Sequence, residues 1–183
     1  MKNVFIDLGA YEGLYIKKFR NSSMYVPGCE VYAFEANPHI RDINYGDDVT
    51  VKNVAAWTED GELQFYVSRK TPHKVQGSSV YKEKITGNLD KEYPVRVKCI
   101  DFSKWIKENF SPDDNIILKC NIEGSEYDIL EKMIADETIE YIKELWIRWH
   151  WKRCGIPEQR HLNLVIELNK YSIKQHMEYG DFK

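Results

Sequence analysis

Short runs of apolar residues recur along the chain, separated by segments in which apolar residues follow helical spacing. Continuous apolar runs, typical of strands that are buried on both faces, occur at residues 4–8, 31–34 and 116–122. Weaker patterns predict further strands at residues 49–56, 62–67, 95–100, 145–149 and 172–177. Because strands and helices alternate, we expect an α/β, doubly wound fold with a mostly parallel sheet and helices on both faces.

The predicted helices begin directly after strands. The first runs from about residue 12 to residue 22, with an inner face of Leu14, Tyr15 and Phe19. Asn37 and Pro38 provide an N-cap and a first-turn proline for a short helix through residue 43.

Three later helices have their own start signals. Asp101 caps one whose apolar face is Phe102, Trp105 and Ile106. Ser125 and Asp128 resemble a capping box for the next, with an inner face of Tyr127, Leu130, Met133 and Ile134. Pro157 opens the last, with Leu162, Val165 and Ile166 facing inward.

The stretch from residue 68 to residue 93 is polar and has no strand or helix pattern. It carries Gly77 and Gly87, which predicts a long, partly mobile loop. A loop of this length within a compact domain usually has a function, so we expect it to bind an acceptor. Since no linker or repeat interrupts the sequence, residues 1–183 are predicted to form a single domain.

Composition narrows the functional classes. The 183 residues carry 26 Lys+Arg and 29 Asp+Glu, a formal charge of −3, so no basic excess exists to bind nucleic acid. No apolar run is long enough for a membrane span, and strand-like residues begin at Val4, which leaves no room for a signal peptide. The four cysteines are scattered without metal-ligand spacing. We therefore expect a cytoplasmic protein without a structural metal.

The turn after the first strand, Asp7-Leu8-Gly9-Ala10-Tyr11-Glu12-Gly13, is the first candidate binding element. Gly9 and Gly13 permit positive φ and close approach of a ligand, and the helix start behind them attracts a carboxylate. Asp7 either orients a cationic amine or orders the turn. Glu35 ends the second strand, where a carboxylate accepts hydrogen bonds from both hydroxyls of a ribose.

This turn favours S-adenosylmethionine (SAM) over a nicotinamide cofactor. The full G-x-G-x-x-G pattern is missing, because Asp7 stands where the first glycine of that pattern belongs. A cofactor without a pyrophosphate fits such a turn better. An NAD-dependent oxidoreductase is thus the less favoured alternative.

Four segments together carry a family resemblance: Phe5-Ile6-Asp7-Leu8-Gly9-Ala10, Phe34-Glu35-Ala36-Asn37-Pro38, Asn53-Val54-Ala55-Ala56 and Leu118-Lys119-Cys120-Asn121-Ile122-Glu123-Gly124-Ser125-Glu126-Tyr127. In this combination the chain resembles the FkbM family of SAM-dependent methyltransferases from about residue 4 to residue 150. The Gly77-Ser78-Ser79 element looks like the serine-bearing loop of that family. The resemblance implies a Rossmann-like class I methyltransferase domain that uses SAM, most often for O-methylation of a sugar hydroxyl or a natural-product scaffold.

The resemblance also implies site residues for the cofactor. Asp7, Gly9 and Gly13 would line the methionine end, with Ala10 and Tyr11 in the same turn, and Glu35 would bind the ribose. Ala56 and Trp57 would border the adenine. For Trp57 an ordinary place in the core is the alternative.

Two positions depart from the family pattern. Asn121 replaces the usual aspartate of the later motif, and Arg148 stands where relatives tend to have an acid before a Trp-His pair. Both changes remove negative charge, and an amide is neither a general base nor a strong ligand for a hard cation. The two changes therefore argue against a metal-assisted mechanism, and we assign no metal ligands. A SAM-binding or glycan-binding protein with weak or no turnover is the alternative hypothesis.

Methyl transfer to a hydroxyl needs alignment and a base within hydrogen-bond reach of the acceptor. His150, at the end of a predicted strand, and Glu123, in the later motif, are the candidate bases. Lys119 would bond an acceptor hydroxyl or hold Glu123. The structural alternatives are a histidine packed between Trp149 and Trp151 and an acid that favours a helix start.

Aromatic residues make up 13% of the chain, with 5 Trp and 12 Tyr. The run Trp146-Ile147-Arg148-Trp149-His150-Trp151 would place indoles on opposite faces of a strand, one set inside and one at a cleft mouth. Aromatic faces stack on sugar rings, so the run favours a glycan acceptor, with core packing as the alternative. The sequence predicts neither the acceptor's identity nor an oligomeric state.

Overall fold

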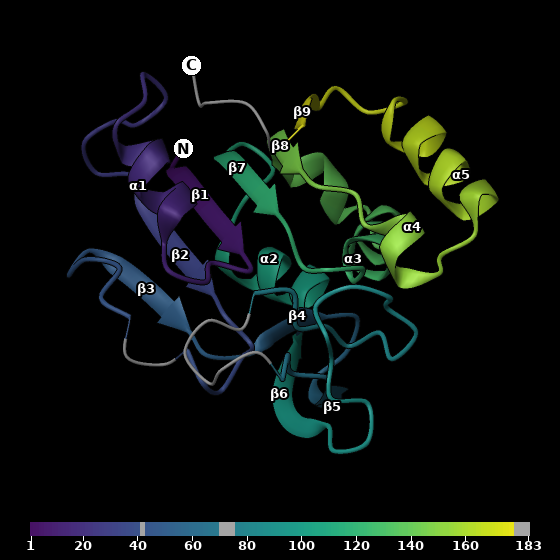
Figure 1. The fold of residues 1–183 in the computed structure, drawn as a ribbon. Coiled ribbons are helices and arrows are strands. Elements are labelled where there is room, and N and C mark those ends of the chain that lie inside the picture. Colours follow the sequence, from purple (N-terminus) through teal and green to yellow (C-terminus); the bar gives the residue numbers. More distant parts are fainter. Residues whose placement is uncertain (41–42, 70–75, 178–183) are drawn as a thin grey trace.

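The computed structural model describes residues 1–40, 43–69 and 76–177. Within these ranges one sheet has six parallel strands in the order β3-β2-β1-β7-β8-β9 (Figure 1). The strands are β1 (Asn3–Leu8), β2 (Glu30–Phe34), β3 (Val49–Lys52), β7 (Asn115–Cys120), β8 (Ile142–Ile147) and β9 (Lys174–Met177). The chain winds outward from β1 to β3 on one side and from β7 to β9 on the other. A crevice for a ligand is expected where the order reverses, beyond the carboxyl ends of β1 and β7.

Helices cover both faces of this sheet, so the predicted α/β fold with a mostly parallel sheet is confirmed. They are α1 (Leu14–Arg20), α2 (Phe102–Asn109), α3 (Glu126–Ala135), α4 (Trp151–Cys154) and α5 (Glu158–Leu168), with a 3-10 turn, η1 (Thr138–Tyr141). Val4, Ile6 and Leu8 of β1 pack in one core with residues of α2 and α3. Phe5 faces the other way and stacks on Phe19 of α1 with ring centroids 4.2 Å apart. Both faces of β1 are buried, which explains its unbroken apolar sequence.

A second, three-stranded sheet stands beyond the carboxyl ends of β1 and β2 (Figure 1). Its order is β4-β6-β5, with β4 (Ala55–Trp57), β6 (Val95–Asp101) and β5 (Gly61–Phe65). The single strand predicted over residues 49–56 is wrong, because the chain leaves the main sheet after Lys52 and enters the small sheet at Ala55. β5 runs antiparallel to β6, as expected after the turn at Gly61.

The start of the chain differs from the prediction in two places. α1 begins at Leu14, later than predicted, because Gly13 at its N-cap has a left-handed φ of 75°. Leu14 is 57% exposed, whereas Ile16 and Phe19 are buried. The short helix predicted after Asn37 is wrong within the described residues, where the Asn37 side chain instead accepts a hydrogen bond from the His39 amide at 3.0 Å. Residues 41 and 42 lie outside the described residues.

The helices after β6 and β7 have the predicted inner faces but not both predicted caps. The Asp101 carboxylate accepts the Lys104 amide at 2.9 Å and thereby caps α2. The capping box at the start of α3 is wrong, since Ser125 makes no side-chain cap there. Asp128, the other half of that box, instead pairs with Arg160 of α5 at 2.9 Å.

α5 begins after Pro157 as predicted, but its inner face is a different one. Leu162 and Ile166 are 46% and 61% exposed, and the buried residues are Leu164 and Leu168. The helix has apolar residues on two sides, so spacing alone did not decide which side meets the sheet.

The predicted loop from residue 68 to residue 93 has no helix and no named strand in its described part. Residues 70–75 lie outside the described residues. Two isolated antiparallel β-bridges fix the remainder, one between Tyr66 and Ser79 and the other between Ser68 and Leu89. Ser79, Lys84 and Leu89 are buried, so this part of the loop packs against the rest of the protein. Among the described residues no helix is long and apolar enough to cross a bilayer.

Candidate active site

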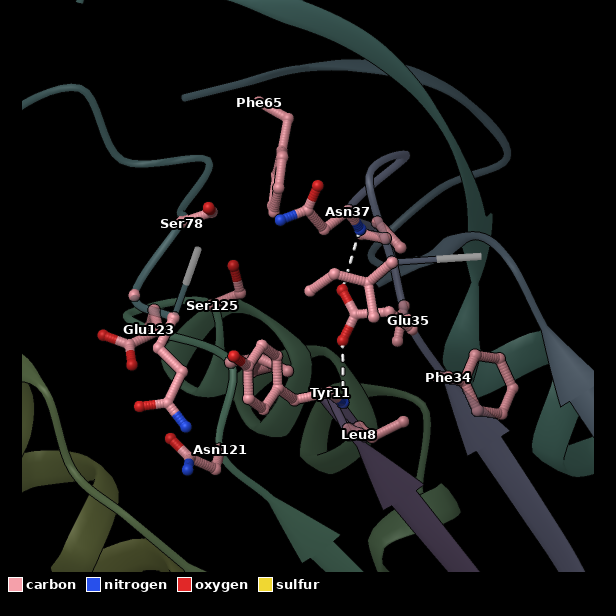
Figure 2. A pocket seen from close by; sticks show the side chains of 18 of the residues that line it. Leu8, Tyr11, Phe34, Glu35, Asn37, Phe65, Ser78, Asn121, Glu123 and Ser125 are labelled. Atoms are coloured by element: carbon pink, nitrogen blue, oxygen red, sulfur yellow. Dashed lines mark hydrogen bonds between the residues drawn. The ribbon is translucent and has the colours of Figure 1, made fainter. Parts of the chain in front are cut away.

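A pocket of about 270 Å³ lies at the reversal point of the main sheet, near the lower end of the usual size of small-molecule sites. Its floor comes from the ends of β1, β2 and β7, and the small sheet and residues 76–80 form the opposite wall (Figure 2). Its apolar lining residues include Phe34, Ile40, Val54, Ala56 and Phe65. Its polar lining residues include Ser78, Asn121, Glu123, Ser125 and Arg148. The pocket therefore offers both apolar surface for a flat group and polar side chains for hydroxyl groups.

The glycine turn forms part of the pocket floor. Gly9 has a φ of 77°, and a Cβ built on it would lie 2.3 Å from the backbone oxygen of Asn121. The amides of Gly9 and Ala10 both donate to the Phe34 carbonyl at 3.0 Å. Because Gly9 has no side chain, its backbone can pack directly against the loop after β7. Gly9 itself lines the pocket.

Glu35 follows β2 at the pocket floor and is held from two sides (Figure 2). Its Oε2 accepts the Tyr11 amide at 2.9 Å, and its Oε1 accepts the Asn37 amide at 2.8 Å. Burial raises the pKa of Glu35, although the two amides and Lys119 act in the opposite direction. Each carboxylate oxygen has a second lone pair, so the group can still accept hydrogen bonds from two hydroxyl groups.

Asp7 lies under the floor, away from the pocket lining. It is fully buried, and its Oδ1 forms an ion pair with the Lys119 ammonium at 2.8 Å. Lys119 also donates to the carbonyls of Leu8 and Gly9 at 3.2 and 3.0 Å. The pair thus orders the turn, which was one of the two roles considered for Asp7. Lys119 contacts neither the pocket nor Glu123, so neither role predicted for it matches its place in the structure.

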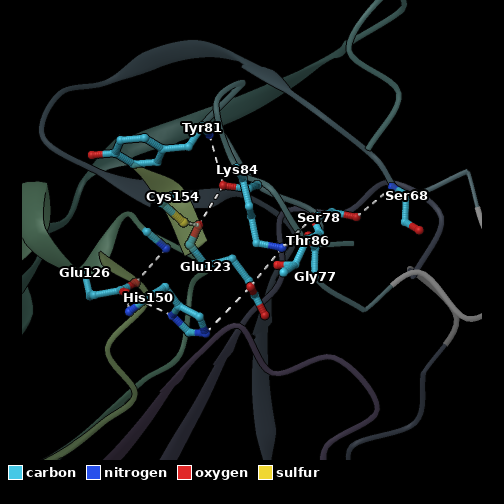
Figure 3. Close-up of polar contacts among 12 residues, drawn as sticks. Ser68, Gly77, Ser78, Tyr81, Lys84, Thr86, Glu123, Glu126, His150 and Cys154 are labelled. Carbon is cyan, nitrogen blue, oxygen red and sulfur yellow. Dashed lines mark hydrogen bonds and ion pairs between the residues drawn. The ribbon is translucent and has the colours of Figure 1, made fainter. Parts of the chain in front are cut away.

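Glu123 lines the pocket and His150 lies behind it (Figure 3). The Nε2 atom of His150 is 3.6 Å from Glu123 Oε2. On its other side, His150 Nδ1 lies 2.9 Å from Glu126 Oε1, and the same oxygen accepts the His150 amide at 2.8 Å. His150 is 1% exposed and absent from the pocket lining. The structure therefore brings both predicted bases together but gives only Glu123 access to an acceptor.

Three other predicted cofactor residues, Ala10, Gly13 and Trp57, do not line the pocket. Ala10 is buried in the core beside α1, and Trp57 packs against the core of the small sheet. Gly13 caps α1, where a Cβ would meet the Tyr45 ring at 2.8 Å. Gly9, Tyr11, Glu35 and Ala56 line the pocket.

The tryptophans predicted to stack on a sugar do not line the pocket. Trp146 is 3% exposed and belongs to the core beside α1, while Trp149 and Trp151 pack against the opposite core. β8 ends at Ile147, so Trp149 is not part of the strand as predicted. The aromatic rings of the pocket come instead from Tyr11, Tyr15, Phe34 and Phe65.

The site also uses residues that sequence reasoning did not single out. Phe65 reaches it from β5, and Lys84, which is 2% exposed, approaches Glu123 from the loop. The loop was predicted from its polar composition, its glycines and the Gly77-Ser78-Ser79 element, but no local pattern signals a buried lysine. Among the described residues no group of three or more His, Cys, Asp or Glu could hold a metal ion.

The sequence model of the methyltransferase FkbM domain matches residues 7–176, which is most of the chain. No curated protein and no solved structure gives a significant match.

Proposed function

This chain belongs to the FkbM methyltransferase domain family, and we propose that it is a SAM-dependent O-methyltransferase. The proposed acceptor is a hydroxyl group of a sugar, a glycan or a related small molecule. Membership of the family identifies the chain as a methyltransferase. The residues of the pocket support SAM as the donor and a hydroxyl group as the acceptor.

The observation that carries the choice of donor is the place of Glu35. It stands at the carboxyl end of β2, beside the turn after β1, with both oxygens oriented by backbone amides. A carboxylate held in this way is suited to a ribose diol, and the apolar lining residues Ala56 and Phe65 are suited to an adenine. Gly9 and Tyr11 of the turn also line the pocket, where the rest of the donor would lie.

When bound, SAM would supply an electrophilic methyl group on a sulfonium. The chain's own task is then to align the acceptor and remove its proton. Glu123 is the proposed base because its carboxylate lines the pocket. His150 stands behind it as a positioning residue, oriented by Glu126. Ser78, Asn121 and Ser125 offer hydrogen bonds for the remaining hydroxyls of the acceptor.

The test is methyl transfer from SAM with a radiolabelled methyl group to a panel of monosaccharides and oligosaccharides. Label in a sugar product, at a position shown by NMR to be an oxygen, supports the proposal. Binding of SAM without transfer to any sugar would favour the weakly active or inactive alternative, for which Asn121 and Arg148 at the pocket are the motivation. Transfer to a nitrogen or carbon acceptor would contradict the assignment to O-methylation.

A further inference from the structure

Lys84 is a buried cation whose ammonium group lies inside its own loop (Figure 3). It donates to the carbonyl of Gly77 at 2.7 Å and to that of Thr86 at 3.1 Å. A lysine is almost never buried unless its charge is paired. The pairing group is Glu123, whose Oε2 lies 3.2 Å from Lys84 Nζ.

The loop backbone is shaped to admit this ammonium. Gly77 and Gly87 have left-handed φ values of 84° and 89°. A Cβ built on either one would come within 3.2 Å of Lys84 Nζ, and one on Gly87 would also lie 2.7 Å from the Gly77 carbonyl oxygen. The two glycines therefore close the loop around the lysine side chain.

Ser79 of the same loop and Cys154 of α4 hold the main chain of Glu123. The Ser79 hydroxyl donates to the Glu123 carbonyl at 2.7 Å, and the Cys154 thiol donates to it at 3.1 Å. Glu123 has a left-handed φ of 54°, a conformation that is uncommon for a residue with a side chain. Both its backbone and its carboxylate are thus held by contacts, and the Lys84 ammonium lies 3.2 Å from the carboxylate.

We propose that Lys84 is a positioning residue that holds the Glu123 carboxylate on the pocket wall and couples it to the loop at residues 76–87. This inference rests on the proposed function, in which Glu123 takes the acceptor proton. Gly77 and Ser78 line the pocket next to Lys84. One ammonium group therefore sets both the orientation of the base and the shape of the wall that an acceptor meets.

The first test observes the contact itself and needs no acceptor. In protein labelled with ¹³C at glutamate carboxyl carbons, the Glu123 resonance is assigned by its loss in Glu123→Gln. Lys84→Met should shift this resonance, whereas Lys82→Met, an exposed lysine of the same loop, should leave it unchanged. An unchanged Glu123 resonance in folded Lys84→Met would overturn the proposal.

The second test observes the Lys84 ammonium group instead of the Glu123 carboxylate. It covers the case in which Lys84→Met does not fold. In protein labelled with ¹⁵N at lysine, Glu123→Gln should shift the Lys84 ammonium resonance, because it replaces a carboxylate by a neutral amide. If that resonance keeps its wild-type position, Lys84 serves its own loop only and the proposal fails.

A third measurement is the rate of methyl transfer to the sugar acceptor found in the panel. Lys84→Met should lower kcat by about 100-fold, the effect of misplacing a catalytic group by about 1 Å, with KM for SAM unchanged. A wild-type protein that binds no SAM, or transfers no methyl group, refutes the proposed function, while the two resonance measurements still decide the role of Lys84.

Discussion

Asp7 and Lys119 are register partners on adjacent parallel strands, and their side chains form an ion pair of 2.8 Å inside the protein. Both side chains are at most 2% exposed. The pair lies directly beneath the turn that begins the pocket, since Lys119 also holds the carbonyls of Leu8 and Gly9. Its position indicates a structural role under the binding site.

Removing one partner of this pair should be costly. Lys119→Met leaves Asp7 as an uncompensated buried charge, and the expected loss is about 3–5 kcal/mol in the free energy of unfolding. Lys2→Met is the control, because its pair with Glu30 is partly exposed and contributes only about 0–1 kcal/mol. Urea denaturation measures both values. Equal losses in the two variants would show that the buried pair does not stabilise the turn.

Gly9 should be intolerant of any side chain. Gly9→Ala combines a left-handed φ with a Cβ that would lie 2.3 Å from a backbone oxygen. Gly28→Ala is the matched control, since Gly28 has a φ of 84° with nothing within 4 Å of the added Cβ. The control should cost about 1–2 kcal/mol, and Gly9→Ala about 1–3 kcal/mol more through overpacking. Thermal unfolding of the two variants side by side checks this difference.

His150→Gln should separate donor binding from turnover. His150 does not line the pocket, so the variant should bind S-adenosylhomocysteine as the wild type does. Its kcat for a sugar acceptor should fall at least about tenfold, because Glu123 loses the ring behind it. His176→Gln is the control, a histidine that pairs with Glu144 on the edge of the sheet. A full rate in His150→Gln would exclude His150 from the reaction.

The pH dependence of donor binding should report Glu35. In the proposed complex the ionised carboxylate would accept hydrogen bonds from the ribose hydroxyls, and burial raises its pKa above the ordinary value of 4.5. As the pH falls through this raised pKa, Glu35 takes up a proton and loses part of its capacity to accept hydrogen bonds. Affinity for S-adenosylhomocysteine should therefore decline at a higher pH than an ordinary glutamate would give. Titrations from neutral to acidic pH test this, and a constant affinity down to pH 4.5 would contradict it.

Much of the fold followed from hydrophobic pattern. β1 and β7 were visible as continuous apolar runs because both of their faces are buried. The break between β3 and β4 was not predictable, because no local signal in residues 49–56 shows that the chain passes from one sheet to the other. The inward face of α5 was also missed, because that helix is apolar on two sides.

The site was predictable where it depends on strand ends and not where it depends on tertiary contacts. Glu35 was found because it ends a strand at this edge of the sheet, and Glu123 because it belongs to the later motif that carries the family resemblance. The pairing of Lys119 with Asp7 depends on the register of two strands far apart in sequence. The burial of Lys84 depends on the path of a long loop, which composition does not fix.

Isothermal titration with SAM and S-adenosylhomocysteine measures whether the pocket binds the proposed donor through Glu35. We predict saturable binding of both ligands by the wild type. Glu35→Gln should weaken binding by about 1.5–3 kcal/mol, roughly ten- to a hundredfold, because hydrogen bonds to a charged group are lost. Glu30→Gln, at the opposite end of β2, should bind as the wild type does. No binding of either ligand by the wild type at millimolar concentration, or equal affinity in Glu35→Gln, would contradict the account.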